Sequence, residues 1–189
     1  MKKIMLMLVA VIGLTVIPVS AKAEVSVAEK VAFYIPNLVV DAVDIFSISL
    51  GVGPVARIEL MATEACRGGV RFGFAAQMVK QVNRQYGFGV RSGQQLSVIA
   101  LGYEEESMFH SYGTVNAYDI SLNGVPDVND VLYDVNDGAR DYWRLGGALG
   151  LLVEGELYLH PLEIADFVCG VFMYDLKGDD LSSESFQMQ

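Results

Sequence analysis

The chain is short of the residues on which most catalytic and metal chemistry depends. Its 189 residues include two histidines, two cysteines and one tryptophan, and 13 basic residues against 23 acidic ones. A structural zinc site needs about four Cys or His ligands close together, and no such set occurs. A nucleic-acid surface must be basic to bind phosphates, so this acidic chain is not expected to bind nucleic acid. Its charge also disfavours anionic lipid headgroups.

The motifs of common active sites are missing as well. No G-x-S-x-G elbow is present, and the glycine-rich pieces GVGP and CRGGVRFGF lack the Lys and Ser/Thr of a phosphate loop. His110 adjoins Ser111, but a serine nucleophile also requires an acid and oxyanion donors. The acidic run Glu104–Glu106 is interpreted as a solvated turn. The sequence therefore predicts no catalytic residue and no cofactor-binding residue, and it favours a protein that is not an enzyme.

The first residues have the pattern of a secretory signal. Lys2 and Lys3 precede an apolar run over residues 4–19, and Ala21 and Ala23 are the small residues that signal peptidase needs. A membrane anchor is the alternative, but the run is short for a spanning helix of about 20 residues. We therefore expect residues 1–23 to be a signal peptide.

Residues 24–189 are then expected to form a single exported domain, with a flexible tail over residues 177–189. Loss of the signal removes three lysines and no acidic residue, so the formal charge changes from −10 to −13. The predicted location is periplasmic or associated with the outer membrane. In an oxidising compartment Cys66 and Cys169 can form a disulfide, and two buried thiols are the alternative.

The remaining sequence alternates between apolar and polar residues, as β-strands do. Seven such segments occur: 45–53, 55–63, 70–79, 85–91, 96–103, 114–122 and 145–160. Helical spacing is found over residues 27–43 (with a break expected before Pro36), over 129–142 and from Pro161. The predicted fold is α+β: an antiparallel, glycine-rich meander of about seven strands, with N-terminal and C-terminal helices packed on it.

The strands have one aromatic face and one smooth face. We expect the helices to cover the aromatic face. The smooth face, lined by Gly73, Ala75, Gly87 and Gly89, is then the predicted interaction face, because glycine lets a ligand or a partner backbone approach closely.

The stretch PDVNDVLYDVNDG, residues 126–138, contains the residue types of a calcium loop. An EF-hand loop needs oxygen ligands at positions 1, 3 and 5 and an acid at position 12. Counting from Asp127 or from Asp134, position 5 is Val131 or Gly138, so the register fails. His160, Glu163 and Asp166 also have a suggestive spacing, but Pro161 separates His160 from the helix. The sequence therefore predicts no metal site.

Two end segments, IPNLVVDAVDIFSISLGVGPVAR and LHPLEIADFVCGVFMYDLKGDD, resemble a family of small exported bacterial cell-envelope proteins. The shared features are a D-x-x-D-I-F entry into the first strand and a C-terminal H-P-x-E-x-x-D-F-x-x-G helix. The resemblance implies an envelope location, and it implies neither an activity nor a site.

Three functions are considered. The leading hypothesis is a non-enzymatic envelope protein that acts by binding or structural association, with an envelope protein or a membrane component as partner. The first alternative is a small outer-membrane β-barrel protein, for which several predicted strands are short. The second is a hydrolase-like periplasmic enzyme, which would show a closed polar pocket around His110 or His160.

Overall fold

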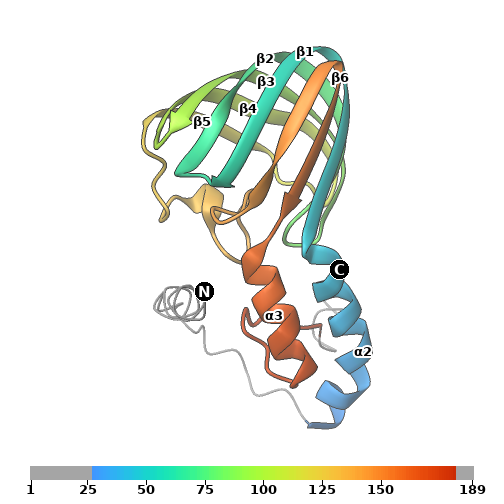
Figure 1. Ribbon diagram of the computed structural model, residues 1–189. Coiled ribbons are helices and arrows are strands. Elements are labelled where there is room, and N and C mark those ends of the chain that lie inside the picture. Colours follow the sequence, from blue (N-terminus) through green and yellow to red (C-terminus); the bar gives the residue numbers. More distant parts are fainter. Residues whose placement is uncertain (1–26, 182–189) are drawn as a thin grey trace.

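The computed structural model describes residues 27–181, so the predicted signal peptide and the last eight residues lie outside the described part. Helix α2 comes first and is followed by four long strands (Figure 1). A short fifth strand, a single 3-10 turn, a sixth strand and a second helix follow in the described part. The elements are α2 Val27–Asp44, β1 Phe46–Thr63, β2 Cys66–Gln81, β3 Gln85–Ile99, β4 Leu101–Gly113, β5 Tyr118–Gly124, η1 Val131–Tyr133, β6 Leu145–Leu159 and α3 Pro161–Val171.

The strands form one antiparallel sheet in the order β5-β4-β3-β2-β1-β6. Figure 1 shows that the sheet is strongly curved, with β5 and β6 at its two edges. The segment between these edge strands, residues 125–144, is mostly irregular and contains η1. The prediction of an α+β antiparallel meander is confirmed.

The prediction of seven strands is wrong, because the sheet has six. The two segments separated by Gly53 and Pro54 are one strand, β1, whose pairing with β6 shifts register between Val52 and Ala56. The segment 96–103 is divided by a turn at Ala100 into the end of β3 and the start of β4. Glu104–Glu106, expected in a solvated turn, lies within β4. The prediction of a glycine-rich sheet is not supported either. The inner face is filled mainly by charged and amide side chains.

The expected helix over residues 129–142 is absent, and only the 3-10 turn Val131–Tyr133 forms. The reason is local: Asp127, Asp130 and Asp134 each accept a hydrogen bond from the backbone N–H two residues later, at 2.9 Å. Such bonds favour turns over helix. Conversely, α2 continues through Pro36, because one missing backbone bond is tolerated in a helix held by its neighbour.

The two helices pack against each other instead of on the sheet. They lie side by side and project from one end of it (Figure 1). The expected start of α3 is confirmed, with Pro161 in the first turn and Glu163 at the positive end of the helix dipole. Among the described residues, no helix combines the length and the hydrophobicity that are needed to cross a membrane.

The sheet is inverted relative to a water-soluble domain. The side of the sheet that we call the outer face exposes large apolar side chains, each between 48% and 75% exposed. The outer face comprises Phe46, Ile48, Leu50, Val52, Ile58, Leu60, Phe72, Phe74, Met78, Phe88, Leu96, Val98, Leu149, Leu151, Val153 and Leu157. The opposite, inner face is buried and charged. The expectation that helices cover the aromatic face is therefore wrong.

The predicted interaction face lies on this inner side. Ala75 is fully buried, Gly89 is buried, and Gly73 and Gly87 are partly buried. At Gly73, with φ of +103°, a Cβ would lie 2.0 Å from the Pro54 carbonyl oxygen, so the glycine serves close strand packing. The four residues thus line the interior and offer no open surface to a partner.

Candidate functional site

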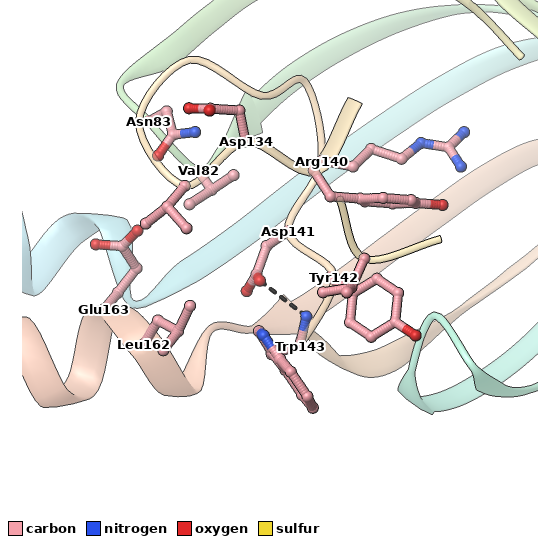
Figure 2. A pocket seen from close by; sticks show the side chains of 12 residues that line it. Val82, Asn83, Asp134, Arg140, Asp141, Tyr142, Trp143, Leu162 and Glu163 are labelled. Carbon is pink, nitrogen blue, oxygen red and sulfur yellow. Dashed lines mark hydrogen bonds between the residues drawn. The ribbon is translucent and has the colours of Figure 1, made fainter. Parts of the chain in front are cut away.

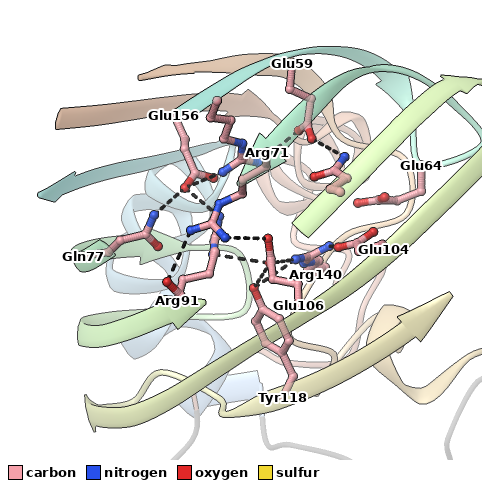
Figure 3. Close-up of polar contacts among 12 residues, drawn as sticks. Glu59, Glu64, Arg71, Gln77, Arg91, Glu104, Glu106, Tyr118, Arg140 and Glu156 are labelled. Atoms are coloured by element: carbon pink, nitrogen blue, oxygen red, sulfur yellow. Dashed lines mark hydrogen bonds and ion pairs between the residues drawn. The ribbon is translucent and has the colours of Figure 1, made fainter. Parts of the chain in front are cut away.

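The inner face carries a set of buried ionic side chains that we call the interior charge network (Figure 3). It contains six arginines and six glutamates, all at most 6% exposed. They are Arg57, Arg67, Arg71, Arg91, Arg140, Arg144, Glu59, Glu64, Glu104, Glu106, Glu154 and Glu156. Charges are almost never buried unless they are paired, and here the two signs are equal in number.

Ion pairs join all twelve side chains into one network. Arg71, which is fully buried, lies 3.5 Å from Glu106 and 3.4 Å from Glu154. Arg57 and Arg91 both contact Glu156, at 3.0 and 2.7 Å. The network therefore crosses the sheet from β4 to β6, and partners up to 99 residues apart in sequence stabilise one another.

Two arginines of the network come from the irregular segment 125–144. Arg140 donates to Glu104 at 2.7 Å and to Glu106, and its guanidinium lies over the Tyr118 ring, 4.8 Å from the centroid. Arg144 contacts Glu64 at 2.6 Å. These contacts hold the segment against the interior of the sheet.

The arginines keep the buried glutamates ionised. Burial by itself raises the pKa of the Glu156 carboxyl, but Arg57 and Arg91 overcome this and lower the pKa to about 2. The pKa of Glu59 and of Glu106 is likewise lowered, because neighbouring arginines outweigh desolvation. Glu59, Glu106 and Glu156 are therefore ionised at neutral pH.

Several buried polar atoms in this interior make no hydrogen bond within the described part of the chain. They include Arg57 Nε, Arg71 Nε, Arg91 Nη2, Glu106 Oε2 and Glu154 Oε2. Buried polar groups without a protein partner are normally satisfied by water. The inner face is therefore expected to be hydrated.

At the end of the sheet nearest the helices, three side chains form a Ser–His–Asp chain. Ser47 Oγ lies 2.6 Å from His160 Nε2, and His160 Nδ1 lies 2.7 Å from Asp141 Oδ2. A carboxylate can only accept, so Nδ1 carries the proton and Nε2 of the neutral ring accepts from the serine hydroxyl. This is the arrangement in which a histidine acts as base for a serine nucleophile.

Two members of the Ser–His–Asp chain, Ser47 and His160, are closed off from solvent, and Asp141 is partly buried. Ser47 is 4% exposed and His160 is 1% exposed. Ser47, His160 and Asp141 border a small pocket. Ser49, Gln81 and Arg144 line the same pocket. Asp141 also borders a neighbouring pocket, which is shown in Figure 2, where its Oδ1 accepts from the Trp143 N–H at 2.8 Å.

Sequence reasoning placed one member of this chain, His160, in a polar environment but missed the other two. Ser47 is one polar residue among many in an alternating strand, and Asp141 lies within the irregular segment 125–144. No local pattern connects them. The three residues with suggestive spacing separate: Glu163 pairs with Lys177 at 2.7 Å, and Asp166 accepts from the Leu176 and Lys177 N–H groups.

Both cysteines are free. Cys66 begins β2, at the end of the sheet away from the helices, and Cys169 lies on α3. The possible disulfide between them is therefore not formed. Asp127 and Asp134, the first residues of the two rejected calcium registers, use their carboxylates to cap local backbone N–H groups.

The two end segments that carry the family resemblance meet in the structure. The His160 N–H donates to the Ile45 carbonyl at 2.9 Å, and α2 packs against α3. Comparison with protein-family models, curated proteins and solved structures gives no match, so function is argued from the geometry alone.

Proposed function

We propose that this protein is embedded in a membrane, as an exported protein of the outer-membrane β-barrel class. Its outer face would contact lipid acyl chains, and its hydrated, charged interior would be shielded from them. The role is structural association with the membrane, and the partner is the hydrocarbon itself.

The observation that carries the proposal is the inverted polarity of the sheet. No charged residue occupies an outward position on β1, β3 or β6, or on β2 as far as Met78. On the other side of the sheet, twelve ionic side chains are buried. Water-soluble monomers rarely expose contiguous apolar patches of more than a few hundred Å². In membrane strands, in contrast, apolar-out and polar-in alternation is the rule.

Strand length supports the same assignment. Five strands have 13–18 residues, and about 9–11 tilted residues are enough to cross a bilayer. The expectation that several strands are too short was wrong. The outward face of β5 and the adjoining part of β4 is polar, with Glu105, Ser107, Asp119 and Ser121, so this strip would lie outside the hydrocarbon.

The test places a fluorescent reporter on the outer face. Trp143, the one tryptophan of the chain, is replaced by Phe, and Phe72→Trp is added on β2. In vesicles of lipids with brominated acyl chains, we expect strong quenching of this Trp, because bromine quenches only on contact.

The matched control carries Ser121→Trp on the polar strip of β5 in the same background, and we expect weak quenching there. Equal quenching at both positions, or none at position 72, would show that the outer face does not lie in the hydrocarbon. In that case a protein partner covers it, as the leading sequence hypothesis holds.

The Ser47–His160–Asp141 chain favours a second function, ester hydrolysis. Ser47 would attack the acyl carbon and give its proton to His160, which Asp141 holds in place, and the ester C–O bond would break as His160 passes that proton to the leaving alcohol. Water would then attack the acyl group, release the acid and restore the Ser47 hydroxyl. Gln81 and Arg144 supply donors in the same pocket. This function ranks second because the hydroxyl is buried and a substrate needs the pocket to open.

A fluorophosphonate probe tests it directly. If the protein is a hydrolase, the probe labels one serine, and labelling is lost in Ser47→Ala but retained in Ser49→Ala, which changes the neighbouring inward-facing hydroxyl on β1. Absence of labelling in the folded wild-type protein would assign the three residues to a structural role, linking β1, α3 and the segment 125–144.

A further inference from the structure

The helical hairpin of α2 and α3 contains a cluster of three carboxylates from three separate parts of the chain. Asp41 lies on α2, Asp166 on α3, and Asp179 on the segment that follows α3. One oxygen atom of each lies within 4.8 Å of the others. Since Ca²⁺ binds oxygens at about 2.3–2.6 Å, three atoms with this spacing can share one ion.

The Asp41 carboxylate is the unexplained group of the cluster. Asp41 is 5% exposed, and in the described part of the chain its carboxylate accepts no hydrogen bond and has no cation within 4.0 Å, although Arg84 acts on it from farther away. It faces Asp166 and Asp179, which carry the same charge. A buried carboxylate without a direct partner is costly, and a bound cation would remove that cost.

Each of the other two carboxylates keeps one oxygen without a hydrogen bond among the described residues. Asp179 Oδ1 is buried and has no partner, whereas its Oδ2 lies 3.5 Å from Lys177 Nζ and 3.9 Å from Arg84 Nη2. Asp166 uses Oδ1 to accept from the Leu176 and Lys177 N–H groups at 2.9 and 3.2 Å. Its Oδ2 makes no hydrogen bond within the described residues.

The surrounding backbone holds the three residues in place. The Leu181 N–H donates to Asn37 Oδ1 at 2.8 Å, which ties the segment after α3 to α2. Gly170 on α3 permits the close approach, because a Cβ there would lie 3.1 Å from Asp41 Oδ2. The site is therefore built from both helices and the following segment.

We propose that Asp41, Asp166 and Asp179 bind one Ca²⁺ ion, which joins α2, α3 and the segment after α3. An all-carboxylate donor set suits a hard cation, and Ca²⁺ tolerates irregular geometry completed by water, whereas Mg²⁺ demands near-octahedral ligands at about 2.0–2.1 Å. The sequence predicted no metal site, since residues 41, 166 and 179 show no ligand motif.

The test uses the full exported chain, folded in detergent micelles and stripped with EDTA. We expect isothermal titration to show one Ca²⁺ bound per chain. We also expect the melting temperature to rise by several degrees at about 1 mM Ca²⁺, a concentration suited to extracellular sites, with a much smaller rise in Mg²⁺.

Asp41→Asn should abolish this Ca²⁺ response while leaving the stability in EDTA equal or higher, because it removes an unpaired buried charge. Asp179→Asn is a second variant, should the first fail to fold. Asp119→Asn, an exposed change on β5, should keep the full response. No response in the wild type, or a response that persists in both site variants, overturns the site; a response to Mg²⁺ alone overturns the assignment to Ca²⁺.

Discussion

Replacing Ile58 by Arg is expected to prevent insertion into lipid vesicles or to weaken the inserted protein by about 2–4 kcal/mol, the cost of Arg on a lipid-facing strand near the midplane. Ile58 is 57% exposed and lies on the outer face between Val70 of β2 and Leu149 of β6. On a surface that faces water, the same change would be nearly neutral.

The matched control is Ser121→Arg, which adds the same charge at an exposed position on the polar strip of β5. Its partner across the strands is Glu105, so we expect no loss. Folded fractions in vesicles and urea unfolding titrations measure both variants. An Ile58→Arg protein that inserts and unfolds like the wild type would contradict the membrane assignment.

Replacing Arg140 by Met is expected to destabilise the protein by about 3–5 kcal/mol, the usual cost of removing one partner from a buried ionic group. Arg140 is 4% exposed and neutralises both Glu104 and Glu106. Its loss leaves two buried carboxylates short of a cation and frees the segment 125–144 from the interior.

A second variant distinguishes lost pairing from lost packing. Adding Glu106→Gln to Arg140→Met removes one of the stranded charges, so part of the lost stability should return. Urea unfolding measures both proteins, and limited proteolysis reports release of the segment. If Arg140→Met alone costs less than about 1 kcal/mol, the network contributes little to stability.

Some features of the fold follow from local sequence. Alternation along Arg71, Phe72 and the residues after them correctly divided β2 into two faces, and Pro161 with Glu163 correctly marked the start of α3. Strand boundaries did not follow from local sequence in the same way. Gly53 and Pro54 indicate a turn in isolation, but the strands on either side hold β1 continuous through an irregularity in pairing.

The acidic segments show the limit of local reasoning most clearly. Glu104 and Glu106 are acidic residues within a short run, which normally indicates a solvated turn. In the structure they lie on a strand and meet Arg67, Arg71 and Arg140. Those arginines come from other parts of the chain, so no window around residue 104 contains the charges that make burial of the glutamates favourable.

The sequence by itself determined that this chain forms an antiparallel sheet with unlike faces and that a helix follows Pro161. Which face points inward was decided only by tertiary structure. Period-two alternation is symmetric: it separates apolar from polar side chains without indicating which set is buried. Which face is buried depends on paired charges that the fold brings together from distant strands, and on the curvature of the sheet that encloses those charges. The fold likewise brings together the carboxylates of Asp41, Asp166 and Asp179.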